Sequence, residues 1–246
     1  MQLDWLTARP IAHRGLHDAA SGVIENMPAA FAAAIDGNYA IECDLQLSRD
    51  GEAMVHHDRD LDRLTTSTGP LASLSASELR EVTFRNTGDR MLSVADLCAM
   101  VGGRVPLVIE MKWQADEDAN LRIVERSVDV LRAYKGPAAL MSFDPGHIEA
   151  LRMRARDIPR GVVAERDYEK TPMSSRDRFW LAHLLHAPKT RPQFIAYRVR
   201  DLPSPAPLMA RFVFGLPLLT WTVRTTGDRA RAAQWASQII FEDFRA

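Results

Sequence analysis

The sequence predicts an α/β protein folded as a single (β/α)8 TIM barrel, and three observations support this prediction. Short apolar segments alternate with longer segments of helical character along the whole chain. Eight strand segments alternate with helical segments, which indicates parallel pairing through right-handed crossovers. The length of 246 residues suits one barrel domain. The pattern also allows a doubly wound open sheet, but a closed barrel fits the number of strands best.

The first part of the chain begins this alternation. Strands are expected at 10–12 and 39–47, with an Ala-rich helix at 26–35 between them. A further short strand at 53–57 follows the turn signal Arg49-Asp50-Gly51. The first two barrel strands and one additional strand therefore lie within this part.

The rest of the chain continues the same order. The run Val-Pro-Leu-Val-Ile in the third barrel strand is almost continuously apolar, as in a strand covered on both faces. Apolar residues recur at helical spacing in the segment that follows it. The expected strands are 105–111, 138–142, 161–164, 194–197, 216–221 and 238–241, and the expected helices are 121–134, 147–156, 176–185, 207–214 and 228–236.

One segment, at about 58–91, interrupts the order and is interpreted as an insertion after the second strand of a single domain, 1–246. It is rich in Thr, Ser, Asp and Arg, and Ser75 is a plausible start for a helix within it. Its few apolar residues are spaced to pack one short helix against the barrel. Long insertions are often lids or binding loops, so we expect this one on the catalytic face.

The composition argues for a small-molecule partner. The chain carries 31 Lys and Arg against 32 Asp and Glu, a formal charge of -1. Such a balance gives no long-range attraction to nucleic acid or to an anionic membrane, so any affinity for phosphate has to be local. The N-terminal segment shows neither a secretory signal nor a membrane span, so a cytoplasmic location without membrane insertion is expected. The sequence leaves the oligomeric state open.

The two cysteines, Cys43 and Cys98, show no spacing typical of a zinc site or of a disulfide framework. A single disulfide between them remains open, but two buried free thiols are the expected arrangement.

Carboxylates gather at the predicted strand ends, where barrel active sites form. Glu42 and Asp44 are two residues apart, so they project to the same face of the second strand, while Cys43 projects to the helices. Glu110 ends the third barrel strand. Three converging carboxylates repel one another, and one bound divalent cation, Mg²⁺ or Ca²⁺, relieves that repulsion.

Two histidines accompany these carboxylates, His13 after the first strand and His57 after the additional strand. Histidine exchanges protons near neutral pH, so the pair suggests one acid and one base. Arg14 and Lys112 add positive charge for a phosphate. Each feature taken alone has a structural explanation, such as a surface Glu-x-Asp pair or a Glu110–Lys112 ion pair. The remaining histidines outside the His56-His57 pair are assigned to structure or surface, namely His17, His147, His183 and His186.

The ordered set of motifs resembles the glycerophosphodiester phosphodiesterase family across nearly the whole chain. The motifs are Ile11-Ala12-His13-Arg14-Gly15, Glu25-Asn26, Ile41-Glu42-Cys43-Asp44, Asp50-Gly51, Val55-His56-His57-Asp58, Leu61-Asp62-Arg63-Leu64-Thr65, Ile109-Glu110-Met111-Lys112, Ser142-Phe143 and Thr220-Trp221-Thr222-Val223. The resemblance implies hydrolysis of glycerophosphodiesters to an alcohol and glycerol 3-phosphate. It also implies roles for the residues: catalysis by His13 and His57, metal ligation by Glu42, Asp44 and Glu110, and substrate binding by Arg14, Lys112 and Trp221.

The chain departs from the family pattern at three places. The family usually has Thr where this chain has Met27, Val-Asn where it has Val223-Arg224, and Thr-Asp where the last strand ends in Phe241-Glu242. We expect none of these departures to touch the metal ligands or the histidines, so they bear on the substrate more than on the reaction.

Two rival functions remain open. A metal hydrolase of the amidohydrolase type expects His-x-His on the first strand and further histidines after the fifth and sixth, where this chain has Glu165 and Tyr197-Arg198. A non-catalytic phosphate-binding barrel is expected to lose a metal ligand or a histidine, and this chain keeps all five.

Overall fold

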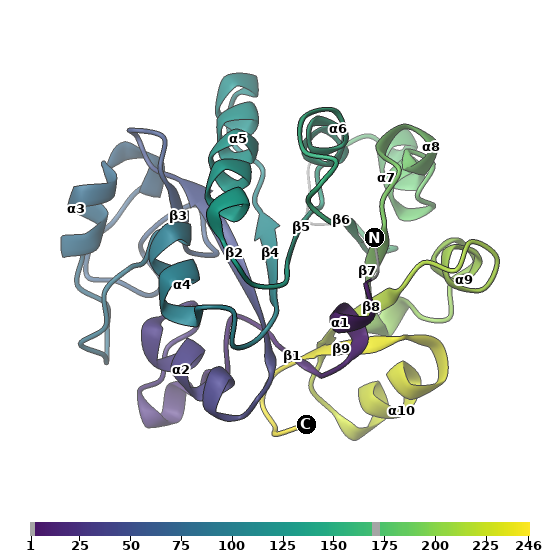
Figure 1. Cartoon of the computed structure of the whole chain (residues 1–246), viewed down its shortest axis with the longest axis horizontal. Coiled ribbons are helices and arrows are strands. Elements are labelled where there is room, and N and C mark those ends of the chain that lie inside the picture. The colour runs from purple at the N-terminus through teal and green to yellow at the C-terminus, as the bar shows by residue number, and fades with distance from the viewer. Residues whose placement is uncertain (1–2, 169–172) are drawn as a thin grey trace.

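The structure, a computed structural model, describes residues 3–168 and 173–246. Within these residues, eight parallel strands close into a barrel, and a ninth strand lies outside it (Figure 1). The barrel strands are β1 (Ile11–Ala12), β2 (Ala40–Leu47), β4 (Leu107–Met111), β5 (Ala138–Ser142), β6 (Arg160–Ala164), β7 (Phe194–Arg198), β8 (Leu218–Val223) and β9 (Gln238–Phe241). The predicted strand segments are therefore confirmed, with ends that differ by a residue or two.

The first strand closes the barrel because it has a partner on each side. Ile11 of β1 is in parallel register with Ala40 of β2 and with Ile240 of β9. The doubly wound alternative is excluded, since an open sheet would leave two free edges. The additional strand, β3 (Ala53–Val55), pairs antiparallel with the end of β2.

The helices lie mostly in an outer ring around the barrel, except that the N-terminal helix packs Leu6 into the barrel interior and one short helix belongs to the insertion (Figure 1). They are α1 (Asp4–Thr7), α2 (Pro28–Asp36), α3 (Ala76–Glu81), α4 (Val94–Val101), α5 (Glu117–Ala133), α6 (Pro145–Arg154), α7 (Ser175–Ala182), α8 (Ala187–Thr190), α9 (Pro205–Phe212) and α10 (Thr226–Trp235). Helices α1, α4 and α8 lie outside the predicted helical segments. Helix α4 has a clear start signal, because the Ser93 hydroxyl and the Asp96 carboxylate cap it reciprocally.

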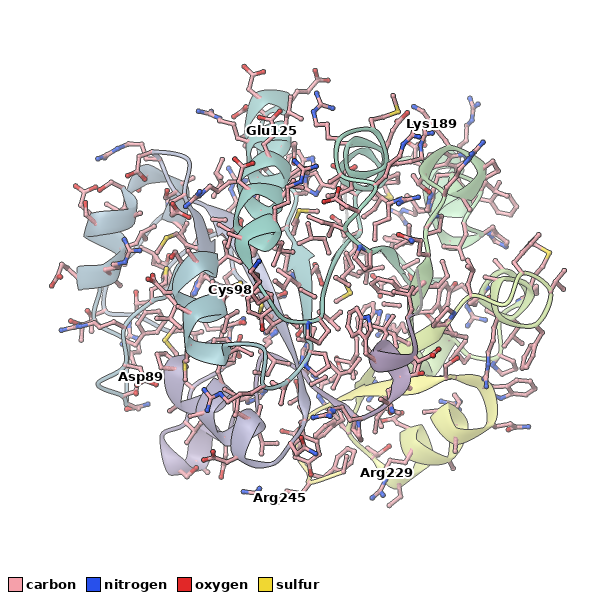
Figure 2. The ribbon with its side chains drawn as sticks, viewed as in Figure 1. Asp89, Cys98, Glu125, Lys189, Arg229 and Arg245 are labelled. Carbon is pink, nitrogen blue, oxygen red and sulfur yellow. The ribbon has the colours of Figure 1, made fainter. Side chains whose placement is uncertain are left out.

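Apolar side chains fill two layers. One layer lies between the sheet and the helices and includes Cys43 and Cys98, which are both buried free thiols as expected. The second fills the barrel interior, where Leu6 of α1 packs with Ile11 and Phe194. Charged side chains such as Glu125 and Lys189 stand on the outer helices (Figure 2).

The insertion has a small core of its own. Leu71, Leu79 and Phe84 are buried there together with Met54 of β3. The predicted helix start is confirmed, because Ser75 and Glu78 form a capping box at α3. The segment is therefore folded against β3 and stands beside the carboxyl end of β2. In the described part of the chain, no helix is long and apolar enough to cross a membrane.

Candidate active site

The three carboxylates predicted as metal ligands converge inside the barrel. Glu42 and Asp44 are buried on β2, and Glu110 on β4 is in register beside Asp44. One carboxylate oxygen from each lies within 4.8 Å of the others. Cys43, between the first two, packs in the layer under the helices. The alternation along β2 therefore places both acids on the inner face, as the spacing predicted.

Two cations partly neutralise this cluster. The ammonium of Lys112 lies 2.8 Å from Asp44 Oδ1 and 2.5 Å from Glu110 Oε1, and Arg14 Nε lies 3.3 Å from Asp44 Oδ2. Burial favours protonation of Asp44, but the attraction of Lys112 and other cations outweighs it and lowers the pKa of this carboxyl. Burial and repulsion by Asp44 and Glu110 raise the pKa of Glu42. The surroundings of Glu42 therefore disfavour its charged form.

These groups fit a divalent cation. All three offer hard oxygen ligands, are buried, and lie close enough together to share one ion. A second group whose ligand atoms lie equally close consists of His13, His17 and Glu242. There the His13 ring and the Glu242 carboxylate contact each other directly, so that group is bonded internally. The carboxylate cluster is the better candidate for a metal centre.

His13 follows β1 in a turn that requires unusual backbone geometry. Arg14 has φ 56° and donates its backbone N–H to Glu42 Oε2 at 3.0 Å. Gly15 has φ 79°, and a Cβ there would lie 2.9 Å from Ala30, so glycine is needed. This turn places His13 Nε2 4.0 Å from Glu42 Oε2.

His57 faces the same cavity, whereas its neighbour His56 does not. The His57 ring nitrogen Nδ1 lies 2.7 Å from Asp58 Oδ1, and the ring lines the cavity. His56 is fully buried and packs against Phe84 of the insertion core. Burial lowers the pKa of both His13 and His57, although the carboxylates near each ring oppose that shift. The structure thus places the predicted pair of histidines at one cavity.

The cavity encloses about 620 Å³ at the carboxyl ends of the strands. Its lining includes every predicted site residue except Asp44, which lies directly beneath. Trp221 stands on the β8 side, where its indole N–H donates to Ala196 O at 3.2 Å and its ring meets Phe143 edge-on. Trp221 and Phe143 therefore add apolar surface to a cavity whose lining also includes charged residues on this side, among them Glu165 and Arg224.

Sequence reasoning assigned no role to three residues that support the site. Asn26, fully buried with φ 58°, donates its amide to Asp44 Oδ2 at 2.9 Å. Glu25 accepts from Arg14 at 2.6 Å and from Arg63 at 2.7 Å. These residues belong to the motifs Glu25-Asn26 and Leu61–Thr65. The sequence therefore identified the residues but did not indicate which side chains they contact.

One expectation about the departures was wrong. Glu242, at the end of β9, contacts Nδ1 of His13, and His17 lies 3.5 Å from the same carboxylate. The departure at 241–242 therefore touches the histidine pair. The closure of the barrel brings the ends of β1 and β9 together, and the sequence pattern alone did not specify which side chains meet there.

The sequence matches the glycerophosphoryl diester phosphodiesterase family over residues 13–245. The chain belongs to this family. A glycerophosphodiester phosphodiesterase from Caldanaerobacter subterraneus is 33% identical over 110 residues, which are 42% of this chain and 44% of that protein. A probable glycerophosphodiester phosphodiesterase 1 from Mycobacterium tuberculosis is 37% identical over 75 residues, 30% of this chain. That match spans 26% of the relative's own length.

Solved structures of the family share the fold. A phosphodiesterase from Oleispira antarctica, in complex with the product sn-glycerol-3-phosphate, superposes with a TM-score of 0.78 at 17% identity, covering 98% of this chain and 95% of that one. A glycerophosphodiester phosphodiesterase from Thermotoga maritima gives 0.70 at 20% identity, covering 94% and 92%. At these identities the likeness concerns the fold.

Proposed function

We propose that the protein hydrolyses glycerophosphodiesters to an alcohol and glycerol 3-phosphate. The observation that carries the proposal is the meeting of two histidines, three carboxylates and two cations at one cavity of the barrel. Family membership supports the reaction class, and the product complex of the Oleispira antarctica relative supports glycerol 3-phosphate as the product.

The metal centre in this proposal consists of Glu42, Asp44 and Glu110, with Mg²⁺ or Ca²⁺ as the ion. Carboxylate oxygens are the ligands that both cations prefer. When bound, the ion supplies Lewis-acid stabilisation for charge on the phosphoryl oxygens. Lys112 and Arg14 lie beside these carboxylates and also line the cavity that would receive the phosphate.

The proton transfers are assigned to His13 and His57. One ring is neutral and takes a proton from the attacking oxygen at Nε2, and the other enters the step as an imidazolium and gives its Nε2 proton to the leaving alkoxide. Both rings line the cavity and each has a carboxylate at Nδ1, which leaves Nε2 for substrate. Arg14 and Lys112 then stabilise the negative charge on the phosphoryl group. Trp221 provides an apolar wall for the carbon chain of the glycerol.

A product analysis tests this function. Metal-loaded protein is incubated with glycerophosphocholine, glycerophosphoethanolamine and glycerophosphoglycerol, and the products are followed by phosphorus NMR and by an enzymatic assay for glycerol 3-phosphate. Glycerol 3-phosphate from at least one substrate, absent with His13→Ala protein, is the expected result. Production of a phosphorylated alcohol instead, or turnover by the variant at the wild-type rate, would overturn the assignment.

A further inference from the structure

Two of the residues at which this chain departs from its family's pattern contact each other beside His13. Arg224 follows β8, and its Nε donates to Oε1 of Glu242, which follows β9. The other oxygen of Glu242, Oε2, contacts Nδ1 of His13. His17 Nε2 lies 3.5 Å from that same Oε2. Both carboxylate oxygens are therefore engaged, one by the arginine and one by the histidines.

This contact determines which nitrogen of His13 carries the proton. Burial favours the protonated form of Glu242, but its bonds with His13 and His17 and the charge of Arg224 outweigh burial and lower its pKa. Glu242 is therefore a carboxylate, which can only accept hydrogen bonds. Whenever the His13 ring is neutral, it donates to this carboxylate through Nδ1–H, and the lone pair is then on Nε2, which lies 4.0 Å from Glu42 Oε2.

Arg224 matters because a glutamate side chain is long and has several rotamers. The guanidinium holds Oε1, which leaves Oε2 at His13 Nδ1. A carboxylate behind the imidazole fixes both the tautomer and the orientation of the ring. The contact between Arg224 and Glu242 thus affects the tautomer and the orientation of His13, which belongs to a motif that this chain shares with the family.

We propose that Glu242, held by Arg224, is a positioning residue that selects the Nδ1–H tautomer of His13 and presents the Nε2 lone pair to substrate. The inference rests on the proposed function in one respect, because the effect on turnover requires that His13 transfer a proton. The tautomer itself can be measured without any turnover.

The first experiment measures steady-state kinetics of the metal-loaded protein with glycerophosphocholine. In Glu242→Gln, the single amide oxygen can serve Arg224 or His13 but not both, so kcat should fall by about 10–100-fold while KM and the Mg²⁺ requirement stay unchanged. Glu242→Asp keeps the charge and should retain more kcat than the glutamine variant. Asp243→Asn is the matched control, since Asp243 is exposed and lies 3.6 Å from Arg224. Equal kcat in the glutamine variant and the control would overturn the proposal.

A double-mutant cycle separates positioning from substrate binding. Arg224 lines the cavity, so it could contact substrate directly. If Arg224 acts through Glu242, the single variant Arg224→Ala has a lower kcat and an unchanged KM. The same change made in the Glu242→Gln protein then causes no further loss of kcat. Losses that multiply, with a raised KM, would mean that Arg224 binds substrate and would overturn its assigned role.

The second readout is the ¹⁵N spectrum of the histidine rings, assigned with a His13→Gln variant. Wild-type protein should show His13 protonated at Nδ1 near neutral pH, and Glu242→Gln should shift part of the population to Nε2–H. A wild-type ring protonated mainly at Nε2 would contradict the inference. This measurement stays decisive even if no glycerophosphodiester is turned over, a result that would contradict the proposed function instead.

Discussion

The side chain of Arg63 in the insertion donates a hydrogen bond of 2.6 Å to the carboxylate of Asp58, the residue next to His57. Arg63 also donates to Glu25, which accepts from Arg14. Asp58 in turn contacts Nδ1 of His57. A continuous chain of charged contacts therefore joins the insertion to both halves of the site, from His57 to the turn that carries His13.

Loss of Arg63 should impair turnover more than folding. Arg63→Ala releases Asp58 and Glu25 together, so the His57 ring loses its fixed orientation, and we expect kcat/KM to fall by about 10–100-fold. Arg85→Ala, a change at another exposed arginine of the insertion, is the control. Kinetics and thermal unfolding are measured for both variants. If both lose activity equally, the insertion acts through its general stability and not through this bridge.

Glu25 should make the protein sensitive to acid. Burial opposes its charge, but hydrogen bonds from Arg63 and the charge of Arg14 outweigh burial and lower its pKa from 4.5 to about 2. A depressed pKa stabilises the fold above pH 4.5, and this contribution is lost as the pH falls toward about 2. Glu25→Gln should therefore reduce the free energy of unfolding by roughly 2–3 kcal/mol at pH 7 and by much less near pH 2–3.

Urea unfolding at several pH values provides the measurement for Glu25. A stability difference between wild type and Glu25→Gln that stays constant from pH 7 to pH 3 would show that lost packing, and not lost charge, explains the effect.

The adjacent histidines should have different roles. His57 lines the cavity, whereas His56 is buried against the insertion core. His57→Ala should lower kcat by about 10²–10⁴-fold with little change in thermal stability, the range expected for a lost acid or base. His56→Ala should lower the melting temperature and keep most of kcat. The reverse pattern would show that the wrong member of the pair was chosen.

Deacylated substrates should be preferred over lysophospholipids. An acyl chain needs an apolar surface to receive it, but the large apolar side chains of the insertion are buried in its own core, namely Leu71, Leu79 and Phe84. We expect a higher kcat/KM for glycerophosphocholine than for lysophosphatidylcholine assayed below its micelle concentration. A clear preference for the lysolipid would mean that another wall of the cavity receives the chain.

The sequence predicted most of the barrel because strand and helix alternation is a local pattern. The positions of Glu42, Asp44 and Glu110 followed from two local facts, the alternation of side chains along a strand and the shared carboxyl end of parallel strands. The short α4 was missed because no element was predicted between the insertion at 58–91 and the strand at 105–111. Its Ser93 cap was nevertheless a readable signal.

Other parts of the site depend on closure of the barrel and could not be read locally. Glu242 meets His13 across 229 positions of sequence, and the contact exists only because β9 pairs with β1. Arg63 meets Glu25 because the insertion folds back over the α2 side of the site. Contacts between side chains that are distant in sequence depend on the tertiary structure. The motifs therefore identified Glu25 and Arg63 but did not indicate that these two residues contact each other.

In the proposed function, hydrolysis depends on a metal ion held by the three buried carboxylates. The most direct measurement is glycerol 3-phosphate release from glycerophosphocholine by chelator-treated, dialysed protein before and after titration with Mg²⁺ or Ca²⁺. We predict negligible turnover before the addition and saturable recovery after it in wild type. Glu42→Gln should fold but recover poorly, because the change relieves repulsion in the cluster and removes a ligand. Full activity in the metal-stripped wild-type protein would contradict the account.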